Sequence, residues 1–433
     1  MRRLAKLLVR LFFRRIEVEG LAELPADAPT VLVANHINGL VDALLLMATL
    51  PRFPRFLGKS TLFRILPLWP FLKLAGVVPV YRAKDGESTA RNEGSFRTCR
   101  LLLARKAEVA LFPEGISHDE SMLQPLKTGA ARIALGAAVD DGVPGVVVVP
   151  VGLSYDAKAR FRSRALVHAG PAQDADRWCG GYRGDPHQAV RAMTAELAER
   201  LSAVSPTYRS WVQATELRQI AEIVDRTADA PADGDVDLAR LEVTARNLAD
   251  AEESGRRPQQ FDALRRAFTE YERDLALLGL SDEQISDSNH PGRRSLALAW
   301  AATRVLAALP AAAIGALVHV VPYQIMKRVG AVPTNESIKA TVKLLGCFVL
   351  FTLVYVVLGV VVGETWGPWA GLIAAAGAPA CGYATVRVAE RVKRIGGVMA
   401  GTRVVRQRRA VLATVLAHRA AVVDAAGSVL GPD

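Results

Sequence analysis

Two apolar runs near the end of the chain constrain its fold more than any other feature. Residues 344–363 and 366–386 contain no Asp, Glu, Lys or Arg. Each run matches the roughly 20 residues that a helix needs to cross a bilayer. Positive residues gather on the cytoplasmic side of a membrane, and here they flank the pair on both sides. We therefore predict a transmembrane hairpin with both ends in the cytoplasm. The flanking basic residues are Lys339, Lys343, Arg387, Arg391, Lys393 and Arg394.

A third apolar run, residues 297–321, carries Arg304, Pro310 and His319. Its length and composition fit a span, a re-entrant helix or a helix in the membrane plane. We assign residues 291–433 to a hydrophobic, membrane-associated region. The expectation is an integral membrane protein whose remaining parts lie on the cytoplasmic face of the cell membrane.

The N-terminus has a different membrane signature. Its first 15 residues are MRRLAKLLVRLFFRR, in which leucines recur at helical spacing between basic residues. This pattern predicts a basic amphipathic helix on a membrane surface, and we assign residues 1–27 to it. A signal peptide fits poorly, because Lys and Arg interrupt any apolar core. The remaining alternative is a helix that packs on the next domain and keeps its basic face in water.

Charge and cysteine content limit the partners. The formal net charge is +11, which points to an anionic partner. Because the basic residues flank apolar runs instead of forming a stripe interleaved with aromatic residues, we expect membrane lipids and no nucleic acid. The four cysteines lie far apart and form no CxxC pair, which disfavours a zinc or iron–sulfur site. We expect no metal and no bound cofactor.

Between the two membrane signatures, the chain changes character at about residue 206. Up to that point, short runs rich in strand formers alternate with helical patterns, which predicts an α/β domain over residues 28–206, a sheet flanked by helices. The expected strands cover 30–34, 76–80, 108–112, 145–151 and 165–169, and the expected helices cover 41–50, 62–74, 88–105, 128–139 and 187–202. Residues 207–290 are polar and helical, and we predict an arm broken at 230–234 and 254–258.

Two polar motifs come directly after predicted strands. The first is NHINGLVD, residues 35–42, and the second is FPEGISH, residues 112–118. Ligands gather at the carboxyl ends of strands in open α/β sheets. His36 can accept a proton from a hydroxyl while the Asp42 carboxylate orients its ring, provided that His36 lies in a turn before the helix that carries Asp42. In the alternative, His36 caps the helix or fills the core, and Asp42 makes a surface contact.

Four segments in order resemble the sequence blocks of the glycerolipid acyltransferase superfamily. They are NHINGLVD, GVVPVYR ending at Arg82, FPEGISH, and VPVGL at 149–153. The superfamily includes glycerol-3-phosphate and lysophosphatidate acyltransferases. The five residues between His36 and Asp42, where four are commoner, resemble a subgroup close to the fungal glycerol-3-phosphate and dihydroxyacetone-phosphate acyltransferases.

This resemblance implies roles for individual residues. His36 is expected to be the general base that activates an acceptor hydroxyl for attack on an acyl thioester, with Asp42 orienting it. Arg82 is expected to bind the acceptor's phosphate, and Glu114 and Gly115 to shape the acceptor pocket. The resemblance implies no covalent acyl-enzyme, and acyl-CoA or acyl-ACP serves as co-substrate.

One departure from the family pattern concerns the acceptor. The third block usually reads FPEG-Thr-Arg-Ser, and Ser117 stands here where the family has its arginine. Lys127, Arg132 or Lys59 can supply the missing charge, so we add Lys127 and Ser117 to the substrate-binding residues. The apolar segments 43–49 and 62–74 are expected to line an acyl tunnel or to fill the core.

The leading hypothesis is a membrane-bound O-acyltransferase of phospholipid biosynthesis that acts on glycerol-3-phosphate or 1-acylglycerol-3-phosphate. A second hypothesis keeps the chemistry but changes the acceptor to a lysophospholipid, dihydroxyacetone phosphate or a glycolipid. The third is a catalytically dead membrane scaffold that binds lipid.

Overall fold

The structure is a computed structural model, and it describes residues 1–66, 68–82, 85–228, 236–288, 291–333, 335–407 and 409–431. The chain divides into two units. An α/β unit comprises Met1–Ala214 and Pro333–Thr341, and a helical unit comprises Thr215–Val332 and Val342–Asp433. The α/β unit therefore contains more of the chain than the predicted domain at 28–206, including a short segment from the apolar C-terminal region.

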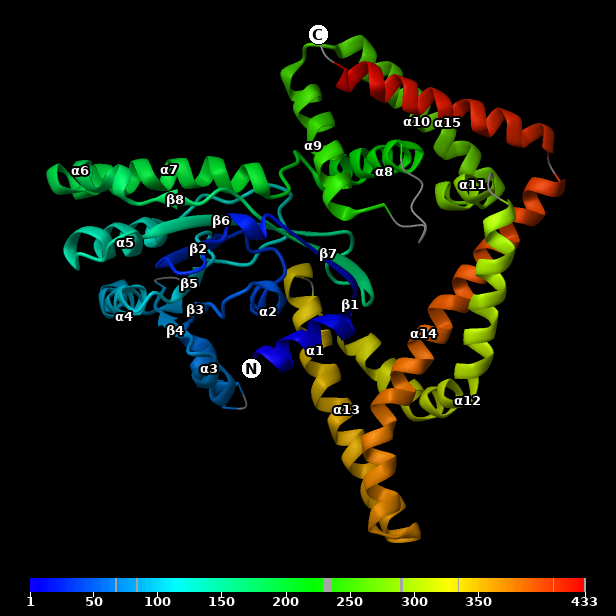
Figure 1. The fold of residues 1–433 in the computed structure, drawn as a ribbon, viewed down its shortest axis with the longest axis horizontal. Coiled ribbons are helices and arrows are strands. Elements are labelled where there is room, and N and C mark those ends of the chain that lie inside the picture. The colour runs from blue at the N-terminus through cyan, green and yellow to red at the C-terminus, as the bar shows by residue number, and fades with distance from the viewer. Residues whose placement is uncertain are drawn as a thin grey trace. The chain divides into compact units, whose positions relative to one another are not determined.

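One sheet forms the centre of the α/β unit (Figure 1). Its strand order is β1-β7-β6-β2-β5-β3-β4, and β8 pairs with β6. β2 lies parallel to both β5 and β6, and every residue of these three strands is buried. Burial on both faces explains their near-continuous apolar sequences. The strands are β1 (Phe13–Glu19), β2 (Thr30–Ala34), β3 (Arg55–Lys59), β4 (Val78–Val80), β5 (Glu108–Leu111), β6 (Val147–Tyr155), β7 (Ser163–Ala169) and β8 (Gln173–Asp174).

Helices cover both faces of this sheet. The connection from β2 to β3 runs along the sheet in one direction, and those from β4 to β5 and from β5 to β6 run in the other. Right-handed crossovers therefore place α2 on one face and α4 and α5 on the opposite face. Val31 and Val33 of β2 share a buried cluster with Ile133 of α5 and Met193 of α7. The helices of this unit are α1 (Arg2–Phe12), α2 (Leu40–Thr49), α3 (Trp69–Ala75), α4 (Asn92–Ala104), α5 (Gly129–Leu135), α6 (Asp176–Gly184) and α7 (Pro186–Val204).

The N-terminal prediction was correct only in part. α1 is a helix, but it ends at Phe12, and the residues after it form β1, which pairs in parallel with β7 at the edge of the sheet. The assignment of residues 1–27 to a separate surface helix is therefore wrong beyond Phe12. One face of α1, including Leu8 and Val9, is buried and packs against α2, whereas Leu7 and Leu11 are exposed beside basic residues.

A second correction concerns residues 62–74, which do not form one buried helix. They fold into the end of a 3-10 turn, η2 (Ser60–Arg64), and the short α3. Leu66 is 84% exposed and Leu74 is 68% exposed, so these side chains neither fill the core nor line a tunnel. Ile65, Trp69 and Phe71 are exposed as well. In contrast, Ala43–Ala48 of α2 are buried, as expected for core residues.

The arm predicted for residues 207–290 is helical in the part that the structure describes. The break at 254–258 is confirmed, because α9 ends at Ser254 and α10 begins at Pro258, whereas the break at 230–234 lies outside the described residues. Leu264, Phe268 and Tyr271 form the buried face of α10. The arm helices are α8 (Trp211–Ala228), α9 (Leu238–Ser254), α10 (Pro258–Leu278) and α11 (Asp282–Ser288).

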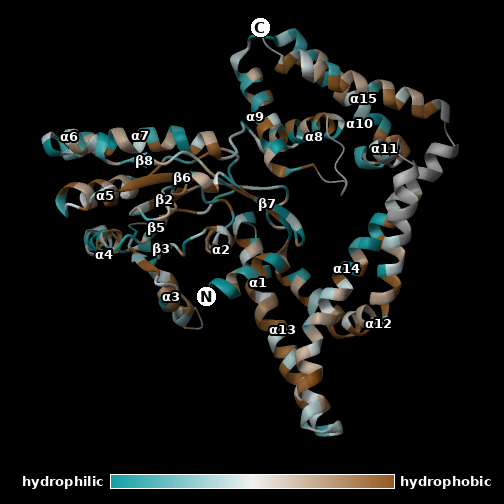
Figure 2. Cartoon of the chain, in the orientation of Figure 1, coloured by the Kyte–Doolittle hydropathy of each residue, from teal (hydrophilic) through white to brown (hydrophobic). Residues whose placement is uncertain are grey.

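Among the described residues, four helices are long and apolar enough to cross a membrane. Three of them, α12 (Pro291–Val329), α13 (Glu336–Trp366) and α14 (Pro368–Gln407), follow the arm in sequence, and α13 is the most apolar (Figure 2). The predicted hairpin corresponds to α13 and α14, although α14 begins at Pro368 and not at Trp366. The fourth, α15 (Arg409–Leu430), packs along the polar α10, and its His418 pairs with Asp274 at 2.7 Å.

α12 is bent and packs against both α14 and α13 (Figure 1). Thr385 Oγ1 of α14 donates to the Ala312 carbonyl at 2.8 Å, so the helices cross there. Further along α12, His319 Nε2 lies 2.8 Å from the Tyr355 hydroxyl of α13. Beyond it, the Met326 side chain of α12 packs against Gly346 of α13. α12 therefore passes first along α14 and then back along α13 toward the start of that helix.

β6 and the end of α7 pack so closely at Gly152 that a larger residue there should destabilise the fold. A Cβ atom at Gly152 would collide with the Val204 carbonyl oxygen, which is backbone and has little freedom to move. We expect Gly152→Ala to cost about 3 kcal/mol, seen as a lower thermal midpoint of the purified full chain in detergent. Gly94→Ala is the matched control, because nothing lies within 4 Å of a Cβ there and alanine favours the α4 helix. A Gly152→Ala midpoint equal to that of wild type would contradict this packing.

Candidate active site

Polar side chains from three strands meet at one edge of the sheet. β2, β5 and β6 are parallel, so their carboxyl ends lie at the same edge, where open α/β sheets bind ligands. His36 follows β2, Glu114 follows β5, and Tyr155 is the last residue of β6. Asn35 ties two of these strand ends together, because its amide nitrogen donates to the Leu153 carbonyl at 3.0 Å.

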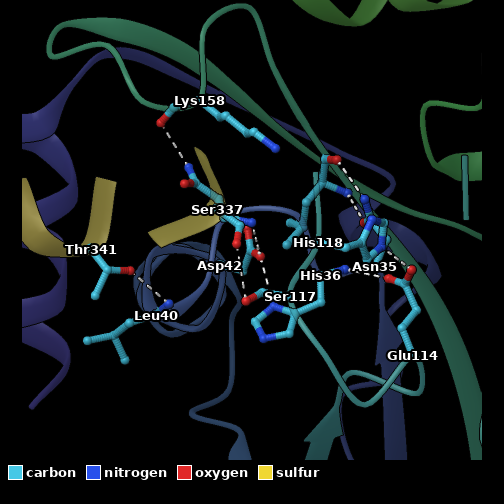
Figure 3. Close-up of polar contacts among 12 residues, drawn as sticks. Asn35, His36, Leu40, Asp42, Glu114, Ser117, His118, Lys158, Ser337 and Thr341 are labelled. Carbon is cyan, nitrogen blue, oxygen red and sulfur yellow. Dashed lines mark hydrogen bonds and ion pairs between the residues drawn. The ribbon is translucent and has the colours of Figure 1, made fainter. Parts of the chain in front are cut away.

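The His36 and Asp42 side chains contact each other, with Nδ1 and Oδ2 separated by 2.9 Å (Figure 3). His36 lies in the turn before α2, and Asp42 is the third residue of that helix. Gly39 has a φ of +56°, and this left-handed conformation lets the chain reverse between the two side chains. The five-residue spacing is thus accommodated by a turn before the helix, as the sequence required.

The Asp42 carboxylate is fully buried and accepts several hydrogen bonds. Oδ2 also accepts from the Asn38 backbone N–H at 2.7 Å, and Oδ1 accepts from the Tyr155 hydroxyl at 2.5 Å. Burial raises the pKa of Tyr155 well above 10, and the neighbouring Asp42 carboxylate adds to the rise. Tyr155 therefore stays protonated and remains a hydrogen-bond donor at any physiological pH.

The His36 ring has one engaged nitrogen and one nitrogen left for substrate. The ring stacks on Phe112, with centroids 4.0 Å apart, and 19% of the side chain is exposed. Within the described part of the chain, Nε2 has no hydrogen-bond partner. Since Asp42 accepts the proton of Nδ1, the neutral ring presents the lone pair of Nε2, as a general base requires.

The Glu114 carboxylate holds the backbone of His36. Its Oε1 accepts the backbone N–H of His36 at 2.7 Å, and its Oε2 accepts the backbone N–H of Gln124 at 2.9 Å. His118 Nε2 makes a further close contact with Oε2, and the Glu114 side chain is almost completely buried. Both carboxylate oxygens therefore bond to protein groups, and Glu114 fixes the position of the His36 backbone.

Arg82 and Lys59 share one carboxylate beside the site. Arg82 donates through Nη1 to the Gly115 carbonyl at 2.7 Å and through Nε to Asp85 at 2.7 Å. Lys59 Nζ lies 3.3 Å from the other oxygen of Asp85. The hydrogen bond from Arg82 is the largest cause that lowers the pKa of Asp85, so this carboxylate is ionised at neutral pH.

The other predicted substrate-binding residues lie around the same loops. The Ser117 hydroxyl is 3.4 Å from that of Ser337. Lys127 donates its backbone N–H to the Pro113 carbonyl at 2.7 Å, and its side chain is exposed. Arg132 is occupied on α5, where it pairs with Glu93 at 3.1 Å and lies over Phe96. Of the three candidate cations, Lys59 is therefore the one placed beside Arg82.

Comparison with known proteins shows what this chain is similar to. Residues 15–154 match the family model described as Acyltransferase. The chain is 30% identical over 198 residues to glycerol-3-phosphate O-acyltransferase 2 of Saccharomyces cerevisiae, a match covering 45% of this chain and 26% of the yeast protein. It is 33% identical over 142 residues to the chloroplastic 1-acyl-sn-glycerol-3-phosphate acyltransferase LPAT1 of Arabidopsis thaliana, covering 33% of this chain and 36% of the plant protein.

The chain is thus similar, over part of its length, to glycerol-3-phosphate and 1-acylglycerol-3-phosphate acyltransferases. It spans only part of the length of these curated relatives. Among solved structures, the 1-acyl-sn-glycerophosphate acyltransferase PlsC of Thermotoga maritima matches 46% of this chain and 75% of its own, with 19% identity and a TM-score of 0.35.

Tyr155 is a residue of this site that the sequence analysis missed. Tyr155 lies two residues beyond the fourth family-like segment, at the carboxyl end of a strand predicted to stop at residue 151. A correct strand end would have placed its hydroxyl at the same edge as the motifs. Among the described residues, no group of three or more His, Cys, Asp or Glu side chains is arranged to hold a metal ion.

Removing the Tyr155 hydroxyl tests whether its hydrogen bond is needed to hold the Asp42 carboxylate in place. We expect Tyr155→Phe to lower the rate of acyl transfer by about tenfold, because a hydrogen bond to a charged group contributes about 1.5–3 kcal/mol. Rates of acyl transfer measured side by side for the two proteins check this. A Tyr155→Phe rate equal to that of wild type would contradict the dependence of Asp42 on this hydroxyl.

Proposed function

We propose that this protein is a membrane-bound O-acyltransferase. It moves a fatty acyl group from acyl-CoA or acyl-ACP to a hydroxyl of glycerol-3-phosphate or 1-acylglycerol-3-phosphate. The observation that carries the proposal is the His36–Asp42 pair, with Nδ1 held by a buried carboxylate and Nε2 left for substrate. The printed activities of the yeast and plant relatives support a glycerol phosphate-type acceptor.

The proposed reaction needs one base and no covalent intermediate on the protein. Nε2 of His36 takes the proton of the acceptor hydroxyl as the oxygen attacks the carbonyl carbon of the thioester. The resulting imidazolium is stabilised by Asp42, which Asn38 and Tyr155 hold in place. The tetrahedral intermediate then breaks its C–S bond, and the departing thiolate takes the proton from His36. The products are an ester and a free thiol.

Arg82 and Lys59 are the proposed holders of the acceptor's phosphate. Both cations face Asp85, an arrangement in which a phosphate can replace the carboxylate as their partner. Glu114 remains a proposed residue of the acceptor pocket, where it also holds the backbone of His36. Ser117 and the exposed Lys127 remain proposed contacts for the outer part of the headgroup. The alternative acceptors are dihydroxyacetone phosphate, lysophospholipids and glycolipids, each of which offers a hydroxyl for acylation.

We further propose an integral membrane protein with its acyltransferase domain on the cytoplasmic face. The path of α12, first along α14 and then back along α13, supports a re-entrant helix with both ends on one side. Basic residues at both ends of this helix agree with that side being cytoplasmic. The exposed apolar side chains between Ile65 and Leu74 supply a surface of the domain that suits contact with lipid.

The first test is acyl transfer by membranes that contain the full chain. Radiolabelled glycerol-3-phosphate, 1-acylglycerol-3-phosphate, dihydroxyacetone phosphate, a lysophospholipid and a glycolipid are offered in parallel, each with palmitoyl-CoA and with palmitoyl-ACP. We expect transfer to one of these acceptors and its loss in His36→Ala, by at least about a hundredfold. His187→Ala is the matched control, because His187 is exposed on α7, and it should retain wild-type activity.

The outcomes separate the alternatives. Activity that survives His36→Ala removes the proposed base. Transfer only to a lysophospholipid or a glycolipid moves the acceptor class, and transfer to none of these acceptors favours the lipid-binding scaffold over the enzyme.

Arg82 provides a separate test of acceptor binding. We expect Arg82→Gln to raise the KM for the phosphate-bearing acceptor by about 10- to 100-fold, because a charge-assisted contact contributes about 1.5–3 kcal/mol. The KM for the acyl donor should stay unchanged. Arg82→Lys should recover part of the affinity, since it keeps the charge but loses the guanidinium fork. Steady-state kinetics with each substrate varied in turn measure this, and an equal rise in both KM values would refute a specific phosphate contact.

A further inference from the structure

The first turn of α13 reaches the active site from a distant part of the sequence. Residues 333–341 belong to the α/β unit, although α13 itself continues into the most apolar run of the chain. Ser337 and Ala340 in this turn are completely buried. Figure 3 shows Ser337 and Thr341 beside residues of the NHINGLVD and FPEGISH motifs.

Thr341 satisfies a backbone group that α2 cannot satisfy by itself. The Leu40 N–H is the first amide of α2, where no intrahelical acceptor exists. The N-cap residue is Gly39, which has no side chain to accept such a hydrogen bond. The Thr341 hydroxyl accepts from the Leu40 N–H at 3.2 Å, so it supplies the cap from a residue 301 positions away.

Gly39 also leaves the space that this contact needs. A Cβ at Gly39 would lie 2.8 Å from the Ser337 carbonyl oxygen and 3.0 Å from Thr341 Oγ1, both closer than side-chain carbons normally approach. The glycine therefore serves two purposes, because its φ of +56° forms the turn and its missing side chain admits α13.

A second set of contacts joins the same turn to Asp119, the residue that follows the FPEGISH motif. The backbone N–H of Glu336 donates to Asp119 Oδ2 at 2.8 Å, so Asp119 caps the start of α13. The other oxygen of Asp119 pairs with Lys158 Nζ at 2.8 Å. The Lys158 carbonyl in turn accepts from the Asn38 side chain at 3.0 Å, which returns the network to the first motif.

These contacts bear on catalysis through Asp42. Asp42 lies in the first turn of α2, two residues after Leu40, and its carboxylate must stay within hydrogen-bond distance of His36. A helix end without a cap frays in its first turn, and fraying here would move Asp42 relative to the imidazole.

We propose that Thr341 is a positioning residue of the acyltransferase reaction. Its hydroxyl caps α2, holds the first turn that carries Asp42, and thereby makes the start of α13 part of the active site. The inference rests on the proposed function, since it assigns Thr341 to the reaction that His36 is proposed to perform.

The test compares three variants of the full chain in membranes. Thr341→Val keeps the shape of the side chain but removes the acceptor, and we expect kcat to fall about 3- to 30-fold, the range that follows from losing a helix cap. The KM values for donor and acceptor should not change, because the proposed role of Thr341 is to hold α2 and not to bind substrate. Thr341→Ser should restore kcat to near the wild-type value. Thr352→Val is the matched control, since the Thr352 hydroxyl donates to the Phe348 carbonyl within α13.

Hydrogen exchange of the peptide covering residues 38–46 gives a readout that does not need activity. Exchange in this peptide should be faster in Thr341→Val than in wild type and unchanged in Thr352→Val. Wild-type kcat together with wild-type exchange in Thr341→Val would overturn the inference. A fall in kcat that Thr341→Ser does not restore would also overturn it. If wild type transfers acyl groups to no acceptor, the proposed function fails, and faster exchange in Thr341→Val would then limit Thr341 to a structural role.

Discussion

The buried carboxylate of Asp42 is the constraint on which the rest of the site depends. A charge without exposure to water is tolerated only when hydrogen bonds replace the lost solvent. Here the donors are His36, the Asn38 backbone and Tyr155, which come from the turn before α2 and from the far end of β6. Because each donor must be in place for the charge to be stable, the requirement to satisfy one carboxylate fixes the loop, the helix and the strand end together.

Local patterns in the sequence were sufficient for most of the acyltransferase domain. The buried central strands are short apolar runs that end at polar motifs, so both the sheet and the placement of His36 at its carboxyl edge were predicted correctly. β3 was missed because its sequence, RFLGK, has one fully buried residue and carries a charge at each end. β1 was missed because basic residues continue from α1 into the strand, and only its pairing with β7 shows that Arg15 and Ile16 are extended.

Contacts between distant residues account for what the sequence did not reveal. Tyr155 and Thr341 contribute single hydroxyls to the first motif from 113 and 301 positions away, respectively, measured to Asp42 and Leu40. Neither residue is part of a sequence motif described above. Each takes on its role only because the fold brings its hydroxyl to the first motif. The exposure of the residues around Leu66 was also not predictable from the sequence. An apolar segment has the same composition whether its side chains fill a core or lie on the surface.

The position of α13 also gives a physical reason for the serine at position 117. The resemblance implies an arginine there, yet the Ser117 hydroxyl lies 3.4 Å from that of the fully buried Ser337. A guanidinium directed along this line would enter the space that the first turn of α13 occupies, so the small residue and the docked helix require each other. Elsewhere in the site, Arg82 and Lys59 supply positive charge, and both pair with Asp85. In the proposed reaction, positive charge for the acceptor would therefore come from Arg82 and Lys59 and not from position 117.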